Sequence, residues 1–316
     1  EKALLIEPEN ENFNFQLGIL KMASQPDESL GYLRMVKVDQ PLAVKSRYLA
    51  DVIFAYQAED QRDRWYTLAG QALSQVGEWD AAVESFRLAT EVNPIDASAW
   101  ALLAEAQQQI GEDGTTSLEK ALALDPHGEM VNGLAGIYYQ RQGDLEQAMA
   151  FLQKALSANP GAAVWQIEIG GALADAGRLE EALGAFKSAV EMDRADTESW
   201  EALAKFSLTR NYRVEEEGLP AARQLVLLDP RNPVYLDLLG TAYLTLADLD
   251  SAEKFFLQAL EYDPEQAAIL IHLGQTSLYR GDKESAFAYL RRASASASDE
   301  RLREMAERLL KEYGAR

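Results

Sequence analysis

The chain has 316 residues, of which 47% are hydrophobic and 26% are charged, and it contains no cysteine. This composition allows a large core, and it excludes disulfides, thiol nucleophiles and thiolate metal sites. The formal net charge of −21 at pH 7 repels phosphate backbones, so no nucleic-acid partner is expected. The same charge favours a basic or neutral protein or peptide over an acidic one, although it also serves solubility.

The N-terminal block, residues 1–58, departs from the rest of the chain. Its opening stretch, EKALLIEP, is typical of the last turns of a helix that ends at Pro8, so the sequence is expected to begin inside a repeated unit of a longer protein. One unit follows from Glu11 to Pro41. Residues 42–58 then predict an extra helix, whose apolar residues share one helical stripe. That stripe contains Leu42, Leu49, Val52, Ile53 and Tyr56. Whether this helix is a hinge stays open.

Residues 62–298 repeat one pattern. Each unit ends at a proline or a substitute, most often 34 residues after the previous one. These closing positions are Pro94, Pro126, Pro160, Arg194, Pro230, Pro264 and Ser298. The unit that ends at Pro160 contains Gly143, Ala148, Leu152 and Ala155 at its other recurring positions. Glycine permits a left-handed turn, alanine lets two helices approach, and the bulky residue fills the space between hairpins. Proline ends the second helix because it lacks an amide donor.

This pattern resembles the tetratricopeptide repeat (TPR) family over nearly the whole chain, because several residue classes recur together at one period. The composition is similar to that of bacterial members. The resemblance implies an all-α fold, a right-handed α-solenoid of stacked antiparallel helix pairs called the TPR superhelix. It also implies about eight repeats, seven of them in the main array at 62–298. First helices would line a concave groove, and second helices would form the outer wall.

The C-terminal residues 299–316 predict a capping helix that covers the apolar flank of the last hairpin. The apolar face of this helix would carry Leu302, Met305, Ala306, Leu309, Leu310 and Tyr313.

The turn at residues 209–220 is longer than its counterparts in the other units. It either projects Tyr212, Arg213 and Glu215–Glu217 as a contact loop or forms a solvated connector, and the connector is favoured.

No motif in the sequence carries catalytic chemistry. The two histidines, His127 and His272, lie in different repeats, and neither has a metal ligand at helical spacing. Phosphate-binding glycine loops and nucleophile elbows are missing from the sequence. We therefore expect no enzyme activity, no metal and no cofactor.

The resemblance places a set of mainly polar residues on the groove side of the first helices. These candidate peptide-binding residues are Arg64, Thr67, Gln71, Gln75, Glu105, Gln109, Gln140, Arg141, Glu168, Asp175, Glu198, Glu201, Lys205, Asp237, Thr241, Ile271, His272, Gln275 and Tyr279. Their amides and carboxylates suit hydrogen bonding to an extended or helical peptide. The lysine, asparagine and arginine set with which one TPR subgroup holds a C-terminal carboxylate is missing from the corresponding positions, so a co-chaperone of that kind is not expected.

Several functions remain open at this point. The leading one is a non-catalytic scaffold that binds a protein or peptide segment in its groove. The main alternative is the interaction region of a larger membrane-tethered or enzymatic protein. An RNA-binding helical array is disfavoured by the acidic charge, and self-association through the N-terminal hairpin is a further possibility. The compartment stays open, with the cytoplasm slightly favoured and the soluble part of a membrane-anchored protein as the alternative. No stretch approaches the roughly 18 apolar residues of a membrane helix.

Overall fold

A computed structural model describes residues 7–37, 42–58, 64–297 and 299–314. These residues form helices joined by short turns, without a β-strand among them, so the expected all-α fold is confirmed. The chain divides into two compact units, unit 1 at Glu1–Pro160 and unit 2 at Gly161–Arg316. The domain boundaries expected from the sequence, at residues 58, 62 and 298, remain predictions.

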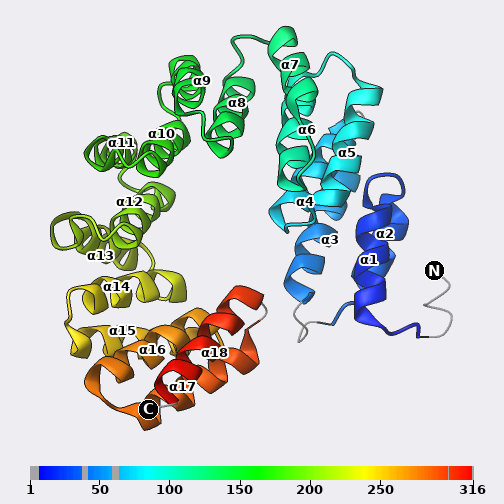
Figure 1. Cartoon of the computed structure of the whole chain (residues 1–316). Helices are drawn as coiled ribbons and strands as arrows, with labels where there is room; N and C mark the ends of the chain where they lie inside the picture. The colour runs from blue at the N-terminus through cyan, green and yellow to red at the C-terminus, as the bar shows by residue number, and fades with distance from the viewer. Residues whose placement is uncertain (1–6, 38–41, 59–63, 298, 315–316) are drawn as a thin grey trace. The chain divides into compact units, whose positions relative to one another are not determined.

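Unit 1 is built from antiparallel hairpins and one additional helix (Figure 1). Its helices are α1 (Glu11–Met22), α2 (Pro26–Leu33), α3 (Ala43–Ala58), α4 (Trp65–Gln75), α5 (Trp79–Val92), α6 (Ala97–Gln109), α7 (Thr115–Leu124), α8 (Glu129–Arg141) and α9 (Leu145–Ala158). The hairpins pair α1 with α2, α4 with α5, α6 with α7 and α8 with α9. The helix expected at residues 42–58 is α3, and it packs between α2 and α4.

Unit 2 continues the hairpin arrangement and ends in the expected capping helix. Its helices are α10 (Ala163–Asp175), α11 (Leu179–Met192), α12 (Thr197–Thr209), the π-helical turn η2 (Val214–Gly218), α13 (Leu219–Leu228), α14 (Pro233–Thr245), α15 (Leu249–Tyr262), α16 (Ala267–Arg280), α17 (Lys283–Ser296) and α18 (Glu300–Gly314). α18 packs on α16 and α17, and its predicted apolar residues Leu302, Met305 and Leu309 join the core around Leu290.

The two helices of a hairpin approach closely where a glycine on the first faces a bulky residue on the second. In the α14–α15 hairpin, a methyl group on Gly240 would lie 2.5 Å from the ring of Phe256. A fully buried Phe256 therefore fills the space that the missing side chain leaves. The same arrangement recurs at Gly70 with Phe86 and at Gly136 with Leu152. The glycine and the bulky residue therefore recur together in the sequence because the bulky side chain fills the space beside the glycine in each hairpin.

Trp65 connects the N-terminal hairpin to α4. Its indole is 3% exposed and its N–H donates to the backbone carbonyls of Met22 and Ala23, at 3.1 and 2.9 Å. Its ring also lies 4.2 Å from that of Tyr56, between centroids. The core that includes Phe15 of α1 therefore runs without a break into α4.

The hairpin turns require a left-handed residue, and glycine supplies it in most repeats. Gly77, Gly143 and Gly177 have φ values of 80°, 77° and 75°. Ala247 stands at the same recurring position and has φ 61°. Because a methyl group disfavours this backbone region by roughly 1–2 kcal/mol, the α14–α15 turn is strained.

Replacing Ala247 by glycine is expected to raise the free energy of unfolding by roughly 0.5–1 kcal/mol, after the entropy cost of glycine is subtracted. The matched change Gly177→Ala is expected to lower it by a similar amount, because nothing lies within 4 Å of the added methyl and only the backbone conformation changes. Urea denaturation of both variants measures the two changes in the free energy of unfolding. A loss of stability in Ala247→Gly would contradict the strain.

Candidate functional site

A pocket of about 470 Å³ opens in unit 1 between α3, α4, α5 and α6. We call it the α3–α6 pocket. It is lined by Tyr48, Val52, Leu68, Gln71, Ala72, Ser74, Gln75, Trp79, Phe86, Leu102 and Glu105. Apolar side chains thus form most of the lining, while two amides and a carboxylate supply hydrogen-bonding groups. This mixture is typical of sites that anchor an apolar side chain and fix the chain around it.

The helix α3 contributes Tyr48 and Val52 to the lining of this pocket. One side of α3 is buried at Leu49 and Ile53, both 0% exposed. Away from these two residues, Val44, Tyr48 and Phe54 are exposed to solvent, at 79%, 40% and 62%. Exposed apolar side chains grouped in this way commonly mark an interaction surface.

The structure brings three of the predicted peptide-binding residues together in this pocket: Gln71, Gln75 and Glu105. The apolar part of the lining, including Tyr48, Leu68 and Leu102, was not predicted from the sequence. One available signal was that α3 carries apolar residues outside its predicted stripe.

The remaining predicted residues differ in accessibility. Half-buried ones are Thr67, Gln140, Glu168, Glu201, Asp237, Thr241, His272 and Gln275, and exposed ones are Arg64, Gln109, Arg141, Asp175, Glu198, Lys205 and Tyr279. Ile271 was wrongly placed on the groove side. It is 1% exposed and belongs to the core that α18 covers, so it is not accessible to a peptide.

Several charged residues of the predicted set form ion pairs with a side chain of a neighbouring repeat. In unit 1, Arg141 donates twice to the Glu105 carboxylate, at 2.5 and 2.7 Å. In unit 2, Arg210 donates to Asp175 at 2.6 Å. Each pair joins an acid on one first helix to a base about 35 residues later. The Glu105 carboxylate in the pocket is therefore already paired with Arg141 before any ligand binds.

His272 and Asp237 form a third pair of this kind, between α16 and α14. The Nδ1 of His272 lies 2.7 Å from Oδ1 of Asp237, and the side chains are 25% and 15% exposed. Burial lowers the pKa of His272, but the charge of Asp237 and its hydrogen bond raise it by more, so the pKa lies above 6.5. Protonated His272 therefore stabilises the contact between the two repeats.

Because of the His272–Asp237 pair, we expect the free energy of unfolding to fall as the pH rises. The folded state holds the His272 proton more tightly, so the contribution is complete below the unfolded pKa of 6.5 and is lost as the pH passes the folded pKa. We expect a contribution of about 1 kcal/mol, reduced by partial exposure. Comparing the parent and His272→Gln between about pH 5.5 and 8.5 isolates it. A constant difference across that range would show that the pair does not titrate.

The long turn at 209–220 is folded onto α11. The hydroxyl of Tyr212 donates to Glu180 at 2.5 Å, and Arg213 donates to the same carboxylate at 2.9 Å. The hydrogen bond from Tyr212, with the charge of Arg213, lowers the pKa of Glu180. Lys187 donates to Glu217 at 2.7 Å. The side chains that the contact-loop alternative would project, Tyr212, Arg213 and Glu217, are therefore engaged within unit 2.

Within residues 7–37, 42–58, 64–297 and 299–314, no three His, Asp or Glu side chains are grouped so that they could hold a metal ion. Among the helices of that part of the chain, none has the length and apolar character needed to cross a bilayer.

This chain is similar to a known protein in sequence and to solved structures in fold. The human protein O-mannosyl-transferase TMTC1 is 25% identical over 206 residues, 63% of this chain. The chain spans only 23% of that relative's length. A tetratricopeptide repeat protein from Parabacteroides merdae superposes with a TM-score of 0.56 at 16% identity, over 78% of this chain and 98% of that one. The APC/C hetero-tetramer Cut9–Hcn1 gives a TM-score of 0.58 at 16% identity, over 95% and 64%. These two similarities concern the fold.

Two family models described as tetratricopeptide repeat match most of the chain. One matches residues 139–206, and the other matches 67–113, 111–163 and 238–300. Stacked repeats of this kind present extended surfaces that bind other proteins, so the chain carries a protein–protein interaction scaffold. With its glycine turns, close hairpins and capping helix, the chain belongs to the tetratricopeptide repeat family.

Proposed function

We propose that the chain is a non-catalytic scaffold that binds a protein or peptide segment at the α3–α6 pocket. The observation that carries this proposal is the pocket itself, in which predicted peptide-binding residues adjoin an apolar lining. A volume of about 470 Å³ accommodates an aromatic or long aliphatic side chain with the chain around it. The amides of Gln71 and Gln75 each offer donors and an acceptor, which suits the backbone of a bound segment.

The bound segment is expected to be basic or neutral, with one bulky apolar anchor. The anchor would pack against Tyr48, Leu68 and Leu102. The carboxylate of Glu105 is already bonded to Arg141, so it contributes little net charge to the pocket. The preference for a basic segment comes instead from the net charge of −21, which attracts cations over the whole surface.

A photo-crosslinking experiment tests this proposal. Benzoylphenylalanine is placed at Leu68, in the pocket, or at Leu257 on α15, which is 43% exposed, and the protein is irradiated in lysate of the cells that produce it. We expect a partner cross-linked from position 68 only. Tyr48→Arg should abolish the cross-link, because Tyr48 lines the pocket. Tyr262→Arg is the matched control, since the two tyrosines are similarly exposed, at 40% and 44%, and it should leave the cross-link in place. Equal cross-linking in the Tyr48→Arg variant would place the binding surface elsewhere.

We propose as a second candidate that the array is the interaction region of a larger enzyme or membrane-tethered protein. The partial match to a mannosyl-transferase, over 23% of its length, favours this candidate. Reading the gene beyond both ends of this sequence tests it. Membrane spans or a transferase domain in the same reading frame would support it, and stop codons close to both ends would contradict it.

A further inference from the structure

A second pocket, of about 440 Å³, lies in unit 2 between α11, α12 and the η2–α13 segment. We call it the Trp200 pocket. It contains none of the predicted peptide-binding residues and is separate from the proposed function. Val190 and Leu203, 6% and 3% exposed, supply its apolar lining beside Trp200. The Trp200 indole is fixed in place, since its N–H donates to the carbonyl of Arg194 at 2.9 Å.

Unit 1 contains a matching site in which the tryptophan is covered. Trp100 stands at the same position of α6 as Trp200 in α12, and its indole N–H donates to the carbonyl of Pro94 at 2.9 Å. The ammonium of Lys120 on α7 lies over the Trp100 ring, 4.0 Å from its centroid. A cation in this position is attracted by the negative face of the ring.

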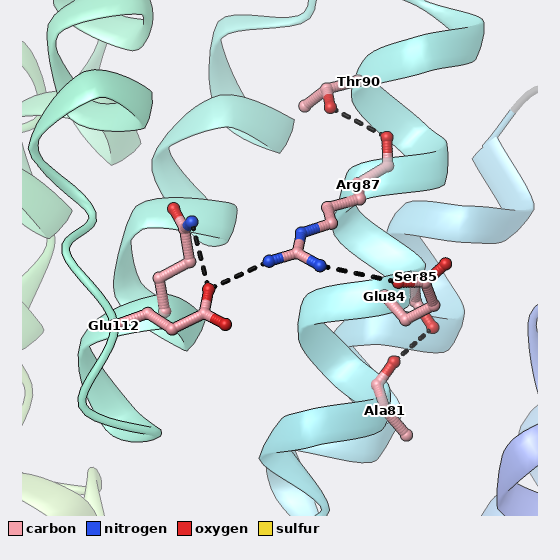
Figure 2. Close-up of polar contacts among 7 residues, drawn as sticks. Ala81, Glu84, Ser85, Arg87, Thr90 and Glu112 are labelled. Atoms are coloured by element: carbon pink, nitrogen blue, oxygen red, sulfur yellow. Dashed lines mark hydrogen bonds and ion pairs between the residues drawn. The ribbon is translucent and has the colours of Figure 1, made fainter.

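The ion pair beside each tryptophan is also matched. Figure 2 shows Arg87 of α5 donating to Glu112, which follows α6, at 2.9 Å. In unit 2, Lys187 stands at the position of Arg87 and bonds to Glu217, which follows α12. The two sites therefore share a leucine (Leu103 and Leu203), their tryptophan and a bridging ion pair, whereas Thr90 stands in unit 1 where unit 2 has Val190.

The sites differ at the residue that covers the ring. Lys120 and Gln224 hold the same position in their helices, counted from Thr115 and Leu219. Gln224 is neutral and lines the open pocket beside Trp200. Within the described residues of unit 2, no lysine or arginine lies over the Trp200 ring. Trp200 therefore lines an open pocket together with Gln224, at the position where Lys120 stands over Trp100 in unit 1.

We infer that the Trp200 pocket binds a lysine or arginine side chain of a partner protein, in the place that Lys120 occupies over Trp100. The aliphatic stem would pack on Val190 and Leu203, and the charged end would lie over the indole. The lining itself has balanced charge, because Lys187 and Arg194 are offset by Glu191 and Glu217. Discrimination against an anionic side chain therefore comes from the ring face and from the net charge of −21.

Fluorine NMR of the full chain labelled with 5-fluorotryptophan tests this inference. The chain has five tryptophans, so single Trp→Phe variants assign the signals. The probes are capped Gly-Lys-Gly and Gly-Arg-Gly peptides, with Gly-norleucine-Gly and Gly-Glu-Gly as controls, in about 0.3 M salt to screen general attraction. We expect the cationic peptides to shift the Trp200 signal saturably, with a dissociation constant on the order of 1 mM, and the controls to leave it in place.

Two variants exchange lysine and glutamine, whose side chains are similar in size, and so reverse the difference between the Trp100 and Trp200 sites. Gln224→Lys supplies the missing cation and should abolish the Trp200 response. Lys120→Gln removes the internal cation and should make the Trp100 signal respond. Circular dichroism checks that both variants remain folded. The inference is overturned if the cationic peptides leave the Trp200 signal unchanged, if norleucine shifts it equally, or if the response persists in folded Gln224→Lys.

Discussion

Replacing Phe256 by alanine is expected to lower the free energy of unfolding of unit 2 by about 3–5 kcal/mol. The ring is 0% exposed and fills the space beside Gly240, where alanine would leave a cavity. It also lies 5.3 Å from the ring of His272, between centroids, so the cavity would adjoin the next repeat. Because each repeat contacts mainly its neighbours, the loss should be greatest in α14, α15 and α16.

Urea denaturation measures the loss from Phe256→Ala, and hydrogen exchange locates it. The matched control is Leu257→Ala on the same helix, where the side chain is 43% exposed and we expect a change of at most about 0.5 kcal/mol. Equal destabilisation by the two substitutions would show that Phe256 does not hold the α14–α15 hairpin together.

Placing an arginine at Ala306 is expected to separate the capping helix from the array. Ala306 is 0% exposed and lies among Leu270, Ile271 and Leu290. An unpaired charge in such a core costs roughly 3–5 kcal/mol, so undocking of α18 becomes the easier route. Exposure of this apolar surface should also promote aggregation.

Hydrogen exchange in α17 and α18 is the measurement for Ala306→Arg, and it should increase strongly there while α4 and α5 in unit 1 are unchanged. Glu304→Arg is the control, because position 304 is exposed on the same helix and accepts a long side chain. Slow exchange in α18 of the Ala306→Arg variant would mean that the cap tolerates a buried charge.

The fold could be predicted from the sequence because the repeat imposes the same local requirements many times. A left-handed turn favours glycine, and the φ values at Gly77 and Gly143 confirm that role. The capping helix was equally predictable, since Leu302 and Met305 recur at helical spacing beside charged residues.

The candidate site was less predictable, because it depends on which surfaces cover one another. Ile271 was assigned to the groove from its position in the repeat, but α18 buries it. Val44 and Tyr48 of α3 are exposed although they are apolar, and spacing within one helix does not reveal which apolar residues stay uncovered. The Glu105–Arg141 pair did leave a signal, because an acid and a base recur about one repeat apart.

The indole of Trp65 has a mechanical consequence for the N-terminal hairpin. Were α3 the sole link, a load applied to α1 and α2 would pass along one helix and bend it, as at a flexible joint. The two hydrogen bonds from Trp65 to the end of α1 form a second, parallel path into α4. Two connections resist twisting better than one, because a rotation of the N-terminal hairpin about α3 would stretch the hydrogen bonds from Trp65. We therefore expect the described part of unit 1 from α1 to α4 to move as one rigid body under load, with little bending at α3.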